Sequence, residues 1–435
     1  MTNIIAKIVE RALATVLVPH FDRAGAFGRD QWGFRKMRSC RDLVTLLVCK
    51  WIWALDNGFK VGIYLSDISG AFDRVDRELL ADDFRRYGVS GCLFRLLYSY
   101  LAPREASVVV QGCASSNFTI EDEVFQGTVL GPPLWNVFFL DIDDTILQCL
   151  FRIAKFADDL TAYRNYCGKT SNVQIEADLT SCQQACHHWG VARRVTFDPA
   201  KEHFCILHKL NCAGDTFRLL GVLVDPRLNM YHEIQRIRKK ARPKIRAILN
   251  TRAYYDTLGL LQQYKAHVLC LLEQSALAIF HAAQSHLESL NRIQRSFVQE
   301  LGLTEAQAFL QFRLAPLELR RDIAALGLLH KIQLGEAHPD FDGLFPKAVH
   351  VEPPVTRHGS RRHGRQFAEI SGNSFYFNHS VFGMTKLYNI LPEYAVACST
   401  VSSFQAVLTK DARMACQTGR RDWKEIYRNR HYGWH

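Results

Sequence analysis

Two adjacent aspartates between two apolar segments constrain this chain more than any other feature. The segments 151–157 (Phe-Arg-Ile-Ala-Lys-Phe-Ala) and 160–164 (Leu-Thr-Ala-Tyr-Arg) predict two strands joined by a tight turn, with Asp158 and Asp159 at its tip. Adjacent carboxylates repel each other, and an exposed hairpin favours Asn-Gly at this position. Divalent cations would neutralise such a pair, so the hairpin predicts a metal-binding edge of a sheet.

A third carboxylate follows another predicted strand. The segment 61–65 (Val-Gly-Ile-Tyr-Leu) is short, apolar and rich in β-formers, and it predicts a buried strand that leads to Asp67. Asp67 has two interpretations: it caps a helix that begins near Asp73, or it holds a metal ion where the strand ends. With Asp158 and Asp159 on a neighbouring strand, three carboxylates could hold two Mg²⁺ ions about 3.5–4 Å apart, the arrangement used in nucleotidyl transfer.

A glycine- and proline-rich segment, 124–136, lies between the two aspartate sites. Gly127 and Gly131 would let the backbone approach a flat ligand closely, and Pro132 and Pro133 favour the start of a helix. A loop of this kind is often only structural, but its place between the aspartates favours a role in binding.

Charge and composition narrow the class of protein. Lys and Arg total 54 against 43 Asp and Glu among 435 residues, a formal net charge of +11. This excess indicates a polyanionic partner, either nucleic acid or an anionic membrane surface. Polar residues interrupt the longest apolar segment, 266–283, so we expect no membrane span. The length predicts about three domains.

The 13 cysteines include no Cys-x-x-Cys pair. Such a chain, without a signal peptide, is expected to keep reduced thiols in the nucleus or cytoplasm. The closest approach to a metal motif is Cys182-x-x-x-Cys186-His187-His188, which is either a metal site or, more often, part of a partly buried helix.

Taken in order, these motifs resemble reverse transcriptases, more narrowly those encoded by non-LTR (LINE-type) retrotransposons. The matching segments are 65–73 (Leu-Ser-Asp-Ile-Ser-Gly-Ala-Phe-Asp), 126–132 (Gln-Gly-Thr-Val-Leu-Gly-Pro), 156–159 (Phe-Ala-Asp-Asp), 219–225 (Leu-Leu-Gly-Val-Leu-Val-Asp) and, upstream, 31–39 (Gln-Trp-Gly-Phe-Arg-Lys-Met-Arg-Ser). The resemblance extends through nearly the whole chain.

The resemblance implies a role for individual residues. Asp67 and Asp158 correspond to the essential ligands of two Mg²⁺ ions (with Mn²⁺ as a substitute), and Asp159 to an accessory carboxylate. Lys201 corresponds to a lysine that protonates the pyrophosphate leaving group, although Glu202 stands where the family usually has Ser or Thr. Phe72 occupies the position of a steric gate against the ribose 2′-hydroxyl. The implied nucleotide-binding residues are Ile68, Ala71, Phe72, Gln126 and Gly127.

The implied fold is α+β, a right-hand polymerase. We expect partial fingers at 1–60, a palm with an antiparallel sheet and an inserted fingers segment at 61–225, a basic helical thumb at 226–300, and a helical accessory region at 301–435. The implied partners are an RNA template, a DNA primer and deoxynucleoside triphosphates, with no membrane. The sequence gives no indication of the oligomeric state.

The segment 236–246 holds seven basic residues in eleven. It is either a solvated helix face or a contact with the phosphate backbone, and the absence of an acid at i+4 favours the phosphate contact. We expect Pro243 to begin or kink a second helical piece, as we expect Pro19 to end a helix over 1–18. The predicted nucleic-acid contacts are Arg35, Arg38, Arg236, Lys239 and Lys240.

Two features of the family are not found in this chain. In the family, a segment whose arginine grips the triphosphate precedes the position matched by Met1, and an endonuclease domain precedes the polymerase. We therefore expect an N-terminally truncated copy with an RNA-directed DNA polymerase centre. The alternative is a catalytically impaired nucleic-acid-binding remnant, and a maturase-like splicing factor is a more distant one.

Overall fold

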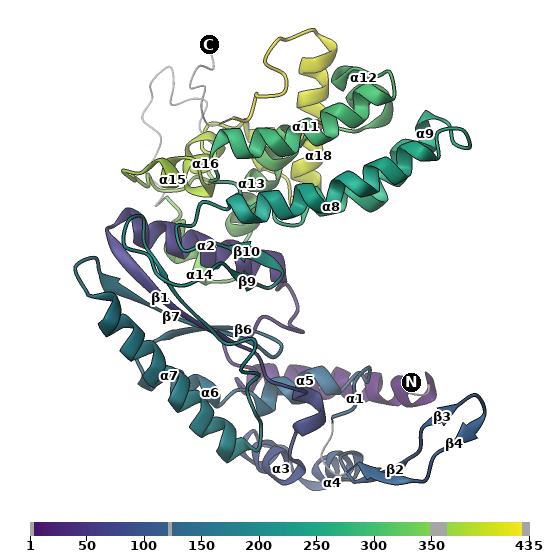
Figure 1. Cartoon of the computed structure of the whole chain (residues 1–435), viewed down its shortest axis with the longest axis vertical. Helices are drawn as coiled ribbons and strands as arrows, with labels where there is room; N and C mark the ends of the chain where they lie inside the picture. The colour runs from purple at the N-terminus through teal and green to yellow at the C-terminus, as the bar shows by residue number, and fades with distance from the viewer. Residues whose placement is uncertain (1–3, 121–123, 349–362, 429–435) are drawn as a thin grey trace. The chain divides into compact units, whose positions relative to one another are not determined.

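The computed structural model describes residues 4–120, 124–348 and 363–428 (Figure 1). These residues form two compact units, each built from two stretches of chain. Unit 1 comprises residues 1–40 and 60–206, and unit 2 comprises residues 41–59 and 207–435.

Unit 1 is built on a four-stranded sheet in the order β6-β7-β1-β8. The strands are β1 (Phe59–Ser66), β6 (Arg152–Phe156), β7 (Asp159–Cys167) and β8 (His203–Leu207). β6 and β7 form an antiparallel hairpin in which Phe156 pairs with Asp159, as the sequence predicts. The strand predicted at 61–65 is also confirmed, because β1 is buried along nearly its whole length.

Helices cover one face of this sheet in Figure 1. The long helix α7 (Asn172–Arg193) packs so closely on β1 that a Cβ atom at Gly62 would lie 2.7 Å from the side chain of Ile175. The other elements of unit 1 are α1 (Ile4–Arg23), η1 (Ala71–Arg74), α3 (Arg77–Arg86), α4 (Gly91–Tyr100), α5 (Gly131–Phe138), α6 (Ile142–Gln148) and a ribbon of the pairs β2 (Arg104–Ala106)–β5 (Phe118–Ile120) and β3 (Val109–Val110)–β4 (Cys113–Ala114).

Unit 2 is mainly helical. The helix α13 (Leu317–Gln333) is buried on most sides and packs against α18 (Val401–Gln417), where the ring of His330 stacks on Phe404 at 4.2 Å. The other elements are α2 (Cys40–Asp56), β9 (Phe217–Leu219), β10 (Val222–Val224), α8 (Tyr231–Asn250), α9 (Thr257–Tyr264), the π-helical η2 (Lys265–Leu269), α10 (Cys270–Glu273), α11 (Gln284–Glu300), α12 (Glu305–Phe312), α14 (Asp340–Leu344), α15 (Phe375–Asn378), α16 (Val381–Tyr388) and α17 (Glu393–Val396).

The predictions for the two prolines were wrong. α1 continues past Pro19 to Arg23, and α8 runs unbroken through Pro243 to Asn250. Both prolines lie on exposed helix faces. There, the carbonyl that loses its amide partner is accessible to water, so a helix packed along its other face can continue.

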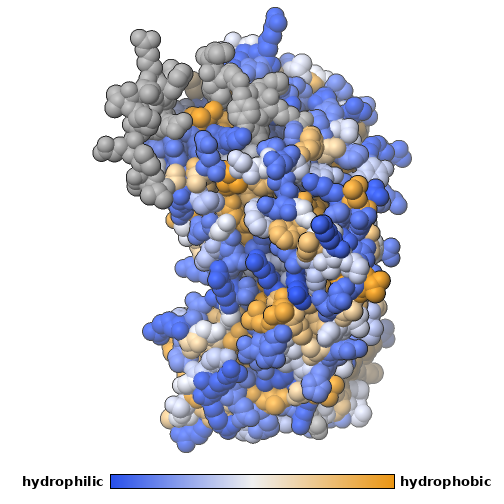
Figure 2. Space-filling view, turned by 90° about the vertical axis from the view of Figure 1, so that its left-hand side faces the viewer, coloured by the Kyte–Doolittle hydropathy of each residue, from blue (hydrophilic) through white to orange (hydrophobic). Residues whose placement is uncertain are grey.

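The outer surface carries mostly polar side chains, and apolar ones gather in smaller patches on the face drawn in Figure 2. Among the described residues, no helix is both long enough and apolar enough to span a bilayer.

Candidate active site

Three carboxylates lie at adjacent strand ends in unit 1. Asp67 directly follows the last residue of β1, while Asp158 lies in the turn between β6 and β7 and Asp159 is the first residue of β7. Since β1 and β7 are neighbours in the sheet, the three residues belong to one edge. The residue before Asp158, Ala157, has a left-handed backbone conformation, with φ of 58°.

The interpretation of Asp67 as a helix cap is wrong. The helix that follows, α3, begins later and is capped by Asp76, whose side chain accepts hydrogen bonds from the amides of Glu78 and Leu79. Asp67 is instead tied to the loop before β8, because its main-chain oxygen accepts the amide of Asp198 at 2.9 Å.

Burial and mutual repulsion disfavour the charged forms of these carboxylates. Burial, and then the negative charge of Asp67, raise the pKa of Asp158. Burial, followed by the charges of Asp67 and Asp158, raises the pKa of Asp159 to about 6. Such a set gains from a nearby positive charge.

One positive charge comes from Lys201. Its ammonium group contacts a carboxylate oxygen of Asp67 and lies 3.7 Å from Oδ2 of Asp198. The hydrogen bond and attraction to Asp67 raise the pKa of Lys201, so the side chain is protonated at neutral pH. Sequence reasoning had placed Lys201 near the reaction, and the structure brings it to Asp67.

The donor chemistry of the three aspartates fits a divalent cation, because oxygen ligands of like charge are what Mg²⁺ prefers. Over residues 4–120, 124–348 and 363–428, however, no group of three or more His, Cys, Asp or Glu side chains is assembled closely enough to hold a metal ion. The lysine on Asp67 accounts for part of this difference, since it already neutralises one of the three carboxylates.

Phe72 lies beside this edge and is half-buried. Its ring packs at 5.9 Å from Trp135 and at 6.4 Å from Phe34, measured between ring centroids. Its main-chain oxygen accepts the amide of Val124 at 2.8 Å, which joins Phe72 to the loop that carries Gln126.

The other predicted nucleotide-binding residues divide into two groups. Gln126 and Gly127 are exposed, and Gly127 has φ of 83°, a conformation that favours glycine. Ile68 and Ala71 are buried, so only their backbone could meet a nucleotide. The predicted helix start after this loop is confirmed by α5, which has prolines in its first turn.

Arg35 and Arg38 have partners within unit 1. Arg35 donates to Asp22 at 2.6 Å and to the main-chain oxygen of Gly28 at 2.8 Å. Arg38 donates to the main-chain oxygens of Arg29 and Gln31, both at 2.5 Å. Both guanidinium groups therefore shape their own loop, and their binding of nucleic acid stays a prediction.

The same loop contains two contacts that sequence reasoning missed. The side chain of Gln31 and the indole of Trp135 both hydrogen-bond the main chain of Ala157, next to Asp158. Their partners are more than 20 residues away in sequence, so the only signal was that the segment 31–39 matches a family motif.

The segment from Cys182 to His188 is part of α7, which favours the helix over the metal site. Both cysteines are buried, while His187 makes a 2.8 Å contact with Glu202, whose carboxylate also accepts the Tyr64 hydroxyl at 2.5 Å. Glu202 thus holds the residue next to Lys201 in place.

In unit 2, the three predicted cations of α8 differ in their surroundings. Arg236 is bound to Glu233 through two hydrogen bonds of 2.7 Å, and Glu233 is fully buried. Lys239 and Lys240 are exposed, and neither has a polar partner in the described parts of the chain. We therefore expect phosphate contacts from the exposed lysines and not from Arg236.

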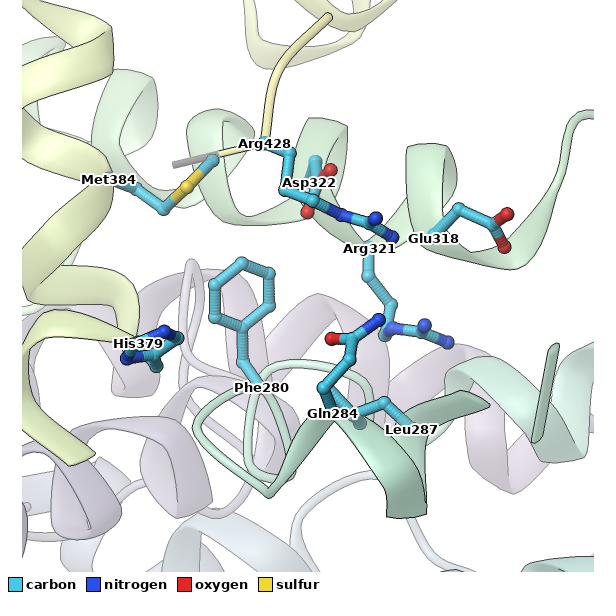
Figure 3. A pocket seen from close by; sticks show the side chains of 9 residues that line it. All are labelled: Phe280, Gln284, Leu287, Glu318, Arg321, Asp322, His379, Met384 and Arg428. Carbon is cyan, nitrogen blue, oxygen red and sulfur yellow. The ribbon is translucent and has the colours of Figure 1, made fainter. Parts of the chain in front are cut away.

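A separate polar pocket lies within unit 2 (Figure 3). Asp322 and Arg321 enter it from α13, and Arg428 lies across from them. Burial raises the pKa of Asp322 to about 8. The pocket contains none of the predicted site residues.

Comparison with known proteins agrees with these features. A family model described as reverse transcriptase (RNA-dependent DNA polymerase) matches residues 1–224. The RNA-directed DNA polymerase from mobile element jockey of Drosophila funebris is 25% identical over 320 residues, covering 68% of this chain and 34% of the relative. The probable RNA-directed DNA polymerase from transposon X-element of Drosophila melanogaster is 25% identical over 309 residues, covering 67% and 34%.

The chain thus spans about a third of the length of these curated relatives. Among solved structures, telomerase from Candida albicans in complex with a TWJ fragment of telomeric RNA matches with a TM-score of 0.37 and 10% identity, covering 76% of this chain and 56% of that one.

Proposed function

This chain belongs to the reverse transcriptase (RNA-dependent DNA polymerase) family, and we propose that it is an RNA-directed DNA polymerase of a non-LTR retrotransposon. It would extend a DNA primer on an RNA template with deoxynucleoside triphosphates. The observation that carries the proposal is the edge at which Asp67, Asp158 and Asp159 follow or begin neighbouring strands, with the ammonium group of Lys201 on Asp67.

Asp67, Asp158 and Asp159 would hold two Mg²⁺ ions, for which Mn²⁺ would substitute. When bound, the ions lower the pKa of the primer 3′-hydroxyl and neutralise the phosphates. The raised pKa of Lys201 keeps a proton on its Nζ atom, which can be donated to the leaving pyrophosphate.

Sugar and base selection would come from the neighbouring loop. The Phe72 ring, supported by Trp135, would exclude a ribose 2′-hydroxyl by steric contact. Gln126 and Gly127 are exposed on the loop that is joined to Phe72, so they would lie beside the incoming nucleotide.

The rest of the chain would serve the template–primer duplex. We assign fingers to residues 1–60, the palm to 61–225, a thumb to 226–300 and an accessory helical region to 301–435. The exposed lysines of α8 would contact phosphates of the duplex without reading its sequence. Activity in the nucleus or cytoplasm follows from this function.

Primer extension tests the proposal. The purified chain, incubated with Mg²⁺, dTTP and poly(rA)/oligo(dT), should lengthen the primer, and Asp158→Asn should abolish extension while keeping duplex affinity within about threefold, because the carboxylate acts on the transition state. Extension by Asp158→Asn equal to that of the parent would refute the assignment. Tight duplex binding without extension by the parent would identify the nucleic-acid-binding alternative.

A further inference from the structure

We infer that Gln31 is a positioning residue for the catalytic turn, because it holds the backbone of Ala157 in the conformation that orients Asp158. The inference rests on the proposed function. It concerns a residue outside the three aspartates and their lysine, and it depends on contacts within unit 1 alone.

The side chain of Gln31 is fully buried and uses both ends of its amide. Its Nε2 atom donates to the main-chain oxygen of Ala157 at 3.0 Å, and its Oε1 atom accepts the amide of Ala157 at 3.0 Å. The Oε1 atom also accepts the amide of Gly33 at 2.8 Å. One side chain therefore satisfies the donor and the acceptor of a single residue in the turn, as a neighbouring strand would.

Ala157 needs such support. Its φ of 58° is left-handed, and a side chain makes this conformation unfavourable relative to the right-handed one. Trp135 adds a third hydrogen bond, from its Nε1 atom to the oxygen of Ala157 at 3.2 Å. Because both main-chain groups of Ala157 are bound on the same side, rotation of the turn would break all of these contacts at once.

Gln31 is itself fixed to the sheet. The amide of Trp32 donates to the main-chain oxygen of Lys155 at 2.7 Å, and the amide of Lys155 donates to that of Asp30 at 2.8 Å, so the segment pairs with β6 on both sides of Gln31. A Cβ atom at Gly33 would lie 2.2 Å from the amide nitrogen of Ala157, so only glycine permits this approach. The support for the turn is therefore rigid.

The consequence concerns the rate of the chemical step. Asp158 follows Ala157 directly, so a change in the backbone of Ala157 moves the carboxylate. A displacement of about 1 Å in a catalytic group lowers a rate by roughly 100-fold. Since Gln31 does not lie on the exposed loop that carries Gln126 and Gly127, its loss should leave substrate binding nearly unchanged.

Gln31→Leu tests this inference in the primer-extension assay on poly(rA)/oligo(dT). We expect kcat to fall by about 10- to 100-fold, while the KM for dTTP and the Kd for the duplex stay within about threefold. Gln294→Leu is the matched control: it removes another buried glutamine with two hydrogen bonds, from unit 2, and should reduce stability without this loss of kcat.

A second substitution distinguishes positioning from a general loss of structure. Ala157→Gly should restore about fivefold of the kcat lost in Gln31→Leu, since glycine adopts the left-handed conformation readily. The same change in the parent should have little effect. A variant whose fold was damaged elsewhere would not be rescued by glycine at this position.

Hydrogen exchange gives a readout that does not depend on activity. The amide of Ala157 should be protected in the parent and in Gln294→Leu, and should exchange faster in Gln31→Leu, with the change limited to the turn between β6 and β7. Unchanged kcat or unchanged protection in Gln31→Leu would overturn the inference. Failure of the parent to extend the primer would refute the proposed function instead, while the exchange experiment would still decide the role of Gln31.

Discussion

The Oε2 atom of Glu10, on α1, accepts the amide of Val129 at 2.5 Å, across 119 residues of sequence. The same atom accepts the amide of Leu130 at 3.2 Å. The residue at the N-cap position of α5 provides no side-chain cap of its own, so Glu10 satisfies free amides just before the helix. The loop with Gln126 and Gly127 is thereby anchored to α1.

Glu10→Ala should therefore destabilise the protein and weaken nucleotide binding. Loss of a carboxylate that caps free amides costs about 0.5–2 kcal/mol of the free energy of unfolding. We expect a lower midpoint in urea unfolding and a several-fold higher KM for dTTP, because the loop before α5 loses its anchor. Glu176→Ala, an exposed position on α7, should change neither value. Equal unfolding midpoints for Glu10→Ala and the parent would show that the capping contact has no energetic weight.

Phe72→Ala should relax the choice of sugar. Removing the ring opens the space in which a ribose 2′-hydroxyl would lie, so the preference for dTTP over UTP, measured as a ratio of kcat/KM, should fall at least about tenfold. Phe34→Ala is the control, because it removes the other ring that packs on Phe72 but leaves Phe72 itself. If Phe72→Ala keeps the parental ratio, its ring serves only the packing against Trp135.

The sequence predicts the parts of this site that depend on neighbouring residues. The hairpin around Asp158 and Asp159 and the strand before Asp67 follow from short apolar runs, and the structure contains both. It could not predict contacts between distant side chains and main chain, such as Gln31 with Ala157 or Glu10 with Val129, because no local pattern records them. The two prolines failed for a related reason, since packing along a whole helix outweighs one missing hydrogen bond.

Asp322 should make unit 2 less stable as pH rises. Burial is the main cause of its raised pKa of about 8, the charges of Glu318 and Glu425 raise it further, and those of Arg428 and Arg321 oppose them. The folded chain therefore keeps a proton that the unfolded chain releases near its ordinary value of 3.8. Stability contributed by this proton is complete below about pH 4 and is lost progressively up to about pH 8.

Urea unfolding between pH 5 and pH 9 measures this effect. Asp322→Asn, which cannot ionise, should flatten the decline and be more stable than the parent at about pH 8. Asp342→Asn, at an exposed carboxylate of α14, should reproduce the parental pH dependence. A parental decline that persists unchanged in Asp322→Asn would assign it to other groups.

The basic face of α8 offers a test of phosphate binding. At about 100° per residue, Lys239, Arg242 and Arg246 lie on one side of the helix, opposite the buried Ile237 and Ala241. All three cations are exposed and have no polar partner among the described residues. A cation that lies against a duplex releases counterions, and each neutralised phosphate contributes about −0.9 to the slope of log K against log salt for B-DNA.

Changing Lys239, Arg242 and Arg246 together to Gln should therefore flatten that slope by about two to three units, to the same degree on different template sequences, because backbone contacts carry no base information. Arg236→Gln is the matched control. Its guanidinium binds the buried Glu233, so it should lower the free energy of unfolding by about 1–3 kcal/mol and leave the slope unchanged. Titration of an RNA–DNA duplex at several salt concentrations separates the two effects. Overlapping slopes for the triple variant and the parent would mean that this face of α8 is solvated and makes no contact with the duplex.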